Sequence, residues 1–407
     1  MSSPEPEFDV VIIGAGIAGA ALARALEGSG LRLALVEAAT LNAELAQSSA
    51  QSVTDFDARV SSITPSTEQF LDSLGAWAEL PQQRLSPYQH MQVWDAEGTG
   101  SIDFHAAELD APVLGHIVEN RQLTAALLTG LMQRPDIQLF NPARLHTLQR
   151  LDDGRVEIQL EDGRGLSGRL LVAADGALSR VRELAGFRTR EWDYGHHALV
   201  ATVETEKPHN GTAYQRFLES GPLAFLPLPE TGDGHYCSIV WSAEPELAAE
   251  LTELSDAEFL ARLEPSIERR LGALVATSPR FSFPLRQRHA ADYIQPGIAL
   301  VGDAAHTIHP LAGQGINLGL QDVAVLAQEV LRVAARGGNP GDLEVLRRYQ
   351  RQRKGENLLM MAAMDGFKRL FGERALPLRW LRNTGMQIVA RSGPIKHQLM
   401  RHAMGIR

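Results

Sequence analysis

The chain has 407 residues, more than one ordinary hydrophobic core supports, so its length predicts at least two domains. Its 44% hydrophobic and 22% charged residues are typical of a soluble globular protein, and no apolar run approaches the roughly 18 residues that a membrane-spanning helix needs. The net charge of −10 argues against nucleic-acid binding, and the single cysteine, Cys237, excludes an intrachain disulfide and indicates a reducing compartment.

The first predicted element is a strand at Phe8–Ile13, which leads directly into a glycine motif. Gly14, Gly16 and Gly19 form GxGxxG ahead of an alanine-rich helix, and a second predicted strand ends at Glu37. This order is typical of a dinucleotide site, because the glycines permit a tight turn and close backbone approach to a pyrophosphate, while the acid binds ribose hydroxyls. Glu37 favours an unphosphorylated ribose, hence FAD or NAD, and the motif leaves the choice between these two open.

Two features in the middle of the chain are compatible with contact with a ligand. Arg121 begins an amphipathic helix predicted at Asn120–Met132, where a cation opposes the helix dipole. A nearby pyrophosphate and an ordinary surface position explain this arginine equally well. A buried strand predicted at Leu170–Ala174 ends at Asp175, and the carboxyl ends of such strands are where open α/β sheets bind ligands.

The pattern changes between about Trp192 and Phe283, where short alternating strands and one polar helix predict an antiparallel sheet. Within it, Phe225 and Leu226 are interpreted as a wall of the substrate pocket or, equally well, as ordinary sheet core. A buried strand from Ile298 then returns to the pattern of the first strand. The fold class is therefore predicted as α/β, with a doubly wound parallel domain, an inserted antiparallel sheet and C-terminal helices.

A second glycine-rich stretch begins at Gly302 and Asp303, directly after that returning strand. Asp303 is placed at the mouth of the parallel sheet, a position for a ligand hydroxyl. Gly313 and Gly315 leave room for a flat ligand, and Asn317 begins a long amphipathic helix whose N-terminus offers unpaired N–H groups. A reduced flavin is an anion that such a terminus stabilises, so this stretch is predicted to hold the flavin end of FAD and the first motif its ADP end.

His306 and His309 lie three residues apart, a spacing that invites a metal site. No acidic or cysteine residue has a spacing suitable to complete such a site, and histidines in loops of this kind more often hydrogen-bond to the backbone. No metal is therefore predicted. Cys237 lies in an alternating strand and is predicted to serve packing.

Three segments together resemble the para-hydroxybenzoate hydroxylase superfamily of FAD-dependent aromatic monooxygenases. They are "GAGIAG" at 14–19, "ADG" at 174–176 and "GDAAHTIHPLAGQGINLG" at 302–319, in the order in which the superfamily has them. The segments "DFDARVSSI" from Asp55, "SPYQHMQVWDAEG" from Ser86 and "LGHIVENRQL" from Leu114 are similar to the ubiquinone-biosynthesis branch, most closely to its 2-polyprenylphenol hydroxylase type.

The resemblance implies how the chain is divided. The FAD domain comprises 1–75, 101–190 and 285–345, a substrate-domain segment lies at 76–100, and the inserted sheet that roofs the substrate lies at 191–284. C-terminal helices with a basic tail occupy 346–407. The implied reductant is NAD(P)H or a protein electron donor, since the sequence has no second GxGxxG and hence no separate nicotinamide domain.

The resemblance also implies roles for single residues. Glu37 would bind the adenosine ribose, Arg59 would lie near the flavin ring and Arg121 near the pyrophosphate, and Asp303 would bind the ribityl chain. Pro310, whose carbonyl would face the substrate, is the one residue assigned to catalysis. The full implied cofactor set is Gly14, Gly16, Gly19, Glu37, Arg59, Arg121, Asp175, Gly302, Asp303, Pro310, Gly313, Gly315, Ile316 and Asn317.

The implied reaction is hydroxylation of a polyprenylated phenol or quinol ring in ubiquinone biosynthesis, through a flavin hydroperoxide and with O₂ as co-substrate. Because the phenol activates itself, no catalytic triad or dyad is needed, and none is found. Three alternatives stay open. They are a flavin hydroxylase of a soluble aromatic acid, for which Arg216 offers a cation, another flavin enzyme such as a reductase, and a flavin-binding scaffold.

The chain ends in a basic tail, in which Phe367 to Arg407 contain nine Lys or Arg residues and one acid. The cations alternate with apolar side chains, as in interfacial helices. The tail is therefore predicted to contact anionic lipid or an acidic partner in a biosynthetic complex, or equally to dock on the chain's own acidic body. The expected location is cytoplasmic and peripheral at the inner membrane, with the oligomeric state open and no nucleic-acid partner.

Overall fold

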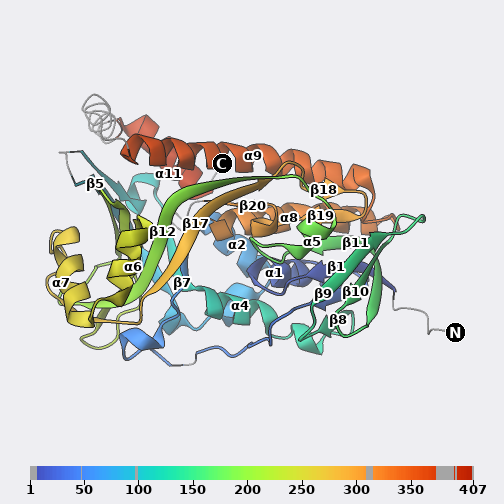
Figure 1. Cartoon of the computed structure of the whole chain (residues 1–407), viewed down its shortest axis with the longest axis horizontal. Helices are drawn as coiled ribbons and strands as arrows, with labels where there is room; N and C mark the ends of the chain where they lie inside the picture. The colour runs from blue at the N-terminus through green and yellow to red at the C-terminus, as the bar shows by residue number, and fades with distance from the viewer. Residues whose placement is uncertain are drawn as a thin grey trace.

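The computed structural model describes residues 7–46, 48–96, 100–308, 315–372, 389 and 392–405. These residues form three sheets, and the two larger ones occupy opposite ends of the elongated molecule (Figure 1). The long strands β12 (Thr189–Thr205) and β17 (Phe281–Ala290) belong to one of these sheets and reach toward the other, and helix α9 (Leu343–Gly372) runs lengthwise over both ends (Figure 1).

The first sheet is mostly parallel and is built from the apolar strands of the predicted nucleotide-binding domain. In spatial order its strands are β18 (Ile294–Gln295), β19 (Ile298–Leu300), β11 (Gly165–Ala173), β1 (Glu7–Ile13), β2 (Leu33–Val36) and β8 (Ile137–Phe140), with β10 (Val156–Leu160) and β9 (Leu145–Arg150) beyond β11. β1 is parallel to both β2 and β11, and β11 is parallel to β19. These strands are almost wholly buried, as is usual for parallel strands covered on both faces.

The helices of this domain pack closely because their contact residues are small. Helix α1 (Ile17–Ala25) contacts both α4 (Asn120–Leu128) and α8 (Gly315–Ala334), and buries a run of alanines and Leu22. The remaining helices of this half are α2 (Pro65–Ser73), α3 (Ala76–Glu79) and α5 (Arg180–Leu184). Leu318, Leu326 and Val330 share one face of α8 and are buried, so the predicted amphipathic helix is present.

The second sheet is antiparallel at every pairing except that between β5 and β13. Its strands in order are β20 (His306–Thr307), β17, β12, β15 (His235–Ala243), β14 (Gly221–Pro227), β13 (Thr212–Leu218), β5 (His90–Asp95) and β6 (Ser101–His105), with β16 (Leu274–Thr277) beside β12. Helices α6 (Pro245–Glu253) and α7 (Asp256–Ser266) cover one face and enclose a second hydrophobic core with it.

The predicted fold class, a doubly wound parallel domain with an inserted antiparallel sheet, is confirmed. The extent of the sheet differs from the predicted segments, however. β6 carries it past residue 100, and the pairing of β12 with β17 extends it to residues 189–290. The strands that run from one domain into the other do not change in amino-acid composition where the domains meet. Composition along the sequence therefore does not locate the domain boundary.

A small third sheet connects the two ends. It consists of β3 (Val60–Ile63), β7 (Gly115–Glu119) and β4 (Ser86–Tyr88), all antiparallel. Helix α11 (Gly393–Ala403) lies near it, and the Lys396 Nζ donates to Glu108 Oε1 at 2.6 Å. A third apolar cluster joins this sheet, Met400 of α11 and the face of the second sheet that lies opposite α6 and α7. Helix α11, which belongs to the basic tail, is therefore docked on the chain's own body.

Candidate active site

The glycine motif lies where β1 ends and α1 begins. The space available for a side chain differs among its three glycines. A Cβ at Gly14 would stand 2.4 Å from the carbonyl oxygen of Ala174, and one at Gly19 would stand 1.8 Å from that of Gly14. Gly14 also has a φ of +99°, which side chains rarely adopt. A Cβ at Gly16, in contrast, would meet nothing within 4 Å. Gly14 and Gly19 thus permit packing within the protein, and Gly16 faces open space.

Glu37 follows β2 directly and its carboxylate is held against the glycine motif. One oxygen accepts a hydrogen bond from the Ala15 N–H at 2.7 Å, and the other accepts from the Ala39 N–H at 2.8 Å. A carboxylate has about four lone-pair sites, so two bonds leave capacity for further donors. Glu37 is therefore fixed at the position from which an acid can bind ribose hydroxyls.

Asp303 follows β19 at the carboxyl end of the parallel sheet. Its side chain is accessible to solvent although many protein atoms surround it, and this crowding raises the pKa of its carboxyl. His306 and Arg59 act in the opposite direction on the same pKa. The Arg59 guanidinium therefore lies within electrostatic range of Asp303, although the two residues are far apart in sequence.

Asn317 joins the start of α8 to the third sheet. Its Nδ2 donates to the Ser62 carbonyl at 2.7 Å, and its Oδ1 accepts from the Thr64 N–H at 3.1 Å. Because Asn317 is buried in these contacts, it fixes the helix start, whose first residues Gly315 and Ile316 remain half-buried. The other members of the predicted cradle, Pro310 and Gly313, lie outside the described residues, as does His309.

Two polar side chains near the glycine motif retain a buried atom without a partner in the described part of the chain. The Gln122 Oε1 accepts from the Ala46 N–H at 2.9 Å, while its Nε2 has no hydrogen-bond partner. Asp175 accepts at one oxygen from the Arg180 and Val181 N–H groups, and its Oδ1 has no partner. Buried polar atoms without partners are rare. Together with the open space at Gly16, they fit a bound polar cofactor such as FAD.

Arg121 is exposed, and its backbone N–H donates to Asp57 Oδ2 at 3.0 Å. Burial raises the pKa of the neighbouring Glu119, and the Arg121 guanidinium is one of the groups that oppose this rise. Its predicted role at a pyrophosphate stays a prediction. The adjacent Gln122 was not predicted from the sequence, where its only signal is an amide on the apolar face of an amphipathic helix.

Sequence reasoning also missed a buried polar network beneath Gly302. Asp322 on α8 accepts from the Gly302 N–H at 3.2 Å, lies 2.5 Å from His306 Nε2, and accepts from Arg353 Nε at 2.8 Å and Asn357 Nδ2 at 3.0 Å. Burial would raise the pKa of Asp322, but His306 and Arg353 more than offset this and hold it below its ordinary value. The network ties the strand end that carries Asp303 to α8 and α9.

An apolar cavity of about 340 Å³ lies between the second sheet, the third sheet and the C-terminal helices. Its lining comprises Val60, Ser62, Tyr88, Met91, Phe104, Leu114, Ile117, Ala213, Tyr214, Gln215, Pro222, Ala224, Leu226, Val240, Ser242, Met360, Ala363, Met364, Leu399, Met400, His402, Ala403 and Met404. Among these residues none is Lys, Arg, Asp or Glu. The cavity adjoins the start of α8, because Ser62 contacts both.

Strand alternation separates the two residues predicted as pocket wall. Leu226 lines the cavity together with Ala224 and Pro222, which are spaced by two along β14. Phe225 points to the opposite face, where it is fully buried in the core beneath α6 and α7. Of the pair, only Leu226 lines the cavity, and Phe225 has the core position that was the equal alternative.

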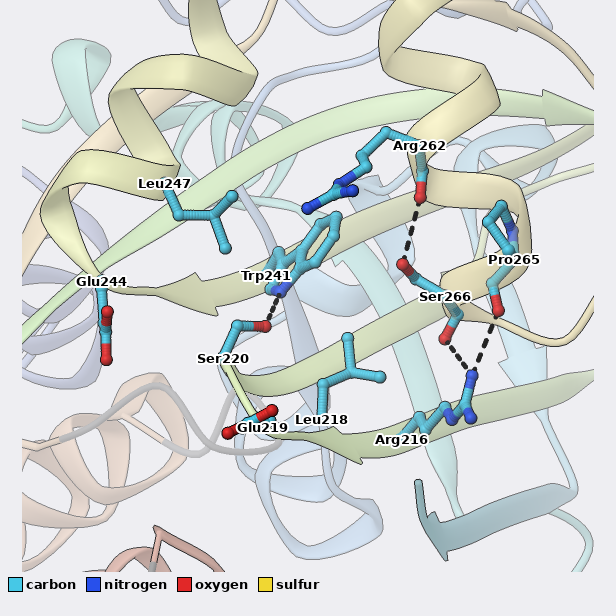
Figure 2. A pocket seen from close by; sticks show the side chains of 10 residues that line it. All are labelled: Arg216, Leu218, Glu219, Ser220, Trp241, Glu244, Leu247, Arg262, Pro265 and Ser266. Carbon is cyan, nitrogen blue, oxygen red and sulfur yellow. Dashed lines mark hydrogen bonds between the residues drawn. The ribbon is translucent and has the colours of Figure 1, made fainter. Parts of the chain in front are cut away.

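Arg216 likewise lies on the face of the sheet that is turned away from the cavity. Its guanidinium donates to the carbonyls of Pro265 and Ser266 at the end of α7, as Figure 2 shows, and it forms an ion pair with Glu268. This site borders a separate, open hollow of about 500 Å³ that Trp241 also lines (Figure 2). Arg216 is therefore not the cation that a soluble aromatic acid would require in the apolar cavity.

The comparisons with known proteins agree with this geometry. The family described as "FAD binding domain" matches residues 7–360. The chain is 37% identical over 398 residues to a 3-demethoxyubiquinol 3-hydroxylase of Escherichia coli, covering 98% of each chain. It is 39% identical over 403 residues to the ubiquinone hydroxylase UbiL of Rhodospirillum rubrum, covering 99% of this chain and 91% of the relative. A variant of HpxO from Klebsiella pneumoniae, complexed with FAD, shares the fold with a TM-score of 0.71 at 19% identity, over 98% of both chains. The chain therefore belongs to the FAD-binding-domain family of FAD-dependent monooxygenases, in the branch that contains the ubiquinone-biosynthesis hydroxylases.

Proposed function

We propose that this protein hydroxylates the aromatic ring of a polyprenylated phenol or quinol intermediate of ubiquinone biosynthesis. The observation that carries the proposal is the apolar cavity, which no Lys, Arg, Asp or Glu lines among the described residues and which adjoins the start of α8 through Ser62. A polyprenylated ring is apolar and uncharged, so it matches such a lining. The relatives' names give the same substrate class.

Residues of the chain have distinct tasks in this reaction. The glycine motif and Glu37 would hold the adenosine half of FAD. Asp303, directly after β19, would bind the ribityl chain, and Arg59 would lie near the flavin ring. The N-terminus of α8 would stabilise negative charge on a flavin ring bound there. When bound, FAD supplies the oxygen activation. The cavity walls exclude water from the substrate ring and orient it, so the protein contributes no acid–base pair of its own.

Some assignments remain part of the proposal. Pro310 and Gly313, with Gly315 and Ile316, would complete the flavin cradle, and the Pro310 carbonyl would face the ring. The reductant is NAD(P)H or a protein donor, and O₂ is the co-substrate. The hydroxylated ring position is that of one of the known ubiquinone ring hydroxylases, which the experiment below identifies.

We also propose contact with a membrane surface, because the prenylated substrate resides in the bilayer. No helix in the described part of the chain is long and apolar enough to span a membrane. Leu399 lines the cavity and is 42% exposed, so it marks an opening, and Leu358 and Leu359 are exposed on α9, immediately before the lining residue Met360. An apolar rim at the opening would allow the substrate to enter from the bilayer.

The decisive experiment expresses the chain in bacterial cells that lack each ubiquinone ring hydroxylase in turn. Mass spectrometry then identifies which quinone intermediate disappears and whether ubiquinone returns. We expect one strain to be rescued by the wild-type chain, and rescue to be lost with Asp303→Ala, which weakens FAD retention. A chain that rescues none of the strains, although it is purified yellow with bound FAD, refutes the ubiquinone assignment and favours a reductase or a hydroxylase of soluble aromatic acids.

A further inference from the structure

Besides Tyr214, which also packs against the core beneath α6 and α7, three residues of the cavity lining carry a hydroxyl group. Ser62 and Tyr88 lie on the third sheet, and the Ser62 Oγ is 2.9 Å from the Tyr88 hydroxyl. Ser242 lies near the end of β15, on the second sheet. None of the three stands out in the sequence, because serine and tyrosine at strand positions have no distinguishing spacing.

Ser242 is the least explained of them. It is 3% exposed, and its hydroxyl has no hydrogen-bond partner among the residues that the structure describes. The adjacent Trp241 projects to the opposite face, where its indole N–H donates to Ser220 Oγ at 3.2 Å (Figure 2), so strand alternation turns Ser242 toward the cavity. A buried hydroxyl without a partner destabilises a protein, and an alanine at this position would not have that cost. The serine is accounted for if a ligand in the cavity supplies the partner.

The Ser62–Tyr88 pair also has unused hydrogen-bonding capacity. Each hydroxyl carries one donor and two acceptor sites, so the single bond between them leaves one proton and further lone pairs. Burial raises the pKa of Tyr88, which therefore stays a neutral hydroxyl. The Ser62 carbonyl accepts from Asn317 Nδ2, so this pair stands next to the start of α8.

We propose that Ser242 and the Ser62–Tyr88 pair bind oxygen substituents of the aromatic ring and so determine which rings the enzyme accepts. This inference rests on the proposed function, in which a phenol or quinol ring enters the cavity. Neutral hydroxyls suit phenolic and methoxy oxygens, whereas a carboxylate is best bound by Lys or Arg, and neither occurs in the described lining. The hydroxyls thus select for oxygen on the ring, and the apolar remainder of the lining receives the prenyl chain.

Binding to the oxidised, FAD-loaded enzyme without reductant tests the inference apart from turnover. The probes are 2-geranyl-6-methoxyphenol and geranylbenzene, which share a tail and differ in ring oxygens. We expect the wild type to prefer the oxygenated probe, and Ser242→Ala and Tyr88→Phe each to reduce that preference about fivefold, the effect of one neutral hydrogen bond. Ser62→Ala is expected to act like Tyr88→Phe, because the two hydroxyls form one pair. Either variant can therefore test the pair if the other folds poorly.

The controls are Ser220→Ala and Tyr236→Phe, which remove hydroxyls outside the cavity lining, bonded to Trp241 and to the Gln51 carbonyl respectively. Both should keep the wild-type preference. The inference is overturned if Ser242→Ala and Tyr88→Phe keep a preference for the oxygenated probe within twofold of the wild type. That result would leave the proposed function intact. Failure of the wild type to bind either probe removes the proposed substrate site and the inference together. Rescue of a hydroxylase-deficient strain reports on the function separately.

Discussion

His306 Nε2 lies 2.5 Å from Asp322 Oδ2, and both side chains are inaccessible to solvent. This contact gives His306 a structural role. It fixes the loop after β19 on α8, and Arg353 secures the same carboxylate from α9. The strand end that carries Asp303 is thus held by an ion-pair network rather than by apolar packing alone.

Asp322→Asn should strongly destabilise the protein, because it removes the buried carboxylate that pairs with Arg353 and leaves that guanidinium only the partly exposed Glu356 as an anionic partner. Removing one partner of a buried pair costs about 3 kcal/mol or more. Urea-induced unfolding at saturating FAD measures the change. Asp292→Asn removes the carboxylate from an exposed pair with Lys354 and should cost less than about 1 kcal/mol. Equal unfolding midpoints for the two variants would show that the network is not a stabilising element.

The glycine motif offers a matched pair of substitutions that separate folding from cofactor binding. Gly19→Ala places a Cβ 1.8 Å from the Gly14 oxygen and should prevent stable folding of this domain. Gly16→Ala meets no protein atom within 4 Å, so the chain should fold, but the methyl group would occupy the space that the pyrophosphate needs. We expect soluble Gly16→Ala protein with at least about tenfold weaker FAD binding, equivalent to about 1.4 kcal/mol. Flavin absorbance after gel filtration measures it, and full FAD occupancy in Gly16→Ala would place the pyrophosphate elsewhere.

Stability should fall as the pH is lowered from about 6.5 to about 4, with His289 as one cause. Burial, followed by the influence of His306 and Lys354, lowers the pKa of His289 from 6.5 to about 4. Between these values the unfolded chain binds a proton at this histidine and the folded protein does not. The contribution of His289 to the free energy of unfolding is therefore complete above pH 6.5 and is lost as the pH falls toward 4. His289→Gln should flatten this dependence in thermal unfolding. His146→Gln, at an exposed position, should leave it unchanged, and a wild-type profile in His289→Gln would assign the pH dependence to other groups.

Replacing both Leu358 and Leu359 with aspartate should weaken binding to anionic phospholipid vesicles. These side chains are 43% and 62% exposed on α9, directly before the lining residue Met360 in sequence, and charged groups there would oppose insertion into the interface. A loss on the order of tenfold is expected in a sedimentation assay. Val275→Asp, at an exposed position on β16, serves as the control. Equal vesicle binding by all three proteins would exclude this face as the membrane contact.

Features that depend on a few consecutive residues could be predicted from the sequence better than features that depend on contacts between distant residues. The glycine motif, Glu37 and the strand before Asp303 could be assigned because each depends on a few consecutive residues. The Asp322 network could not, since its members come from separate elements. Its one sequence signal was an acid at the apolar spacing of α8, four residues from Leu318 and from Leu326.

Alternation in β14 predicts that Phe225 and Leu226 face opposite sides, but not which side holds the substrate. That depends on where α6, α7, α9 and α11 pack, and no short pattern encodes it. Pro310 and Gly313 lie outside the described residues and remain predictions, together with the roles of the other cofactor residues. The basic tail was predicted to touch lipid, a partner or the body, and Lys396 shows the last of these for α11.

Five of the nine methionines, namely Met91, Met360, Met364, Met400 and Met404, line the cavity. Methionine is unbranched and polarizable, so such a wall adapts its shape to different apolar guests at little cost. The ring and the chain of a prenylated substrate would thus be recognised with unequal strictness. Under the proposed function, the enzyme should tolerate tails of several lengths and geometries while discriminating sharply among ring substituents.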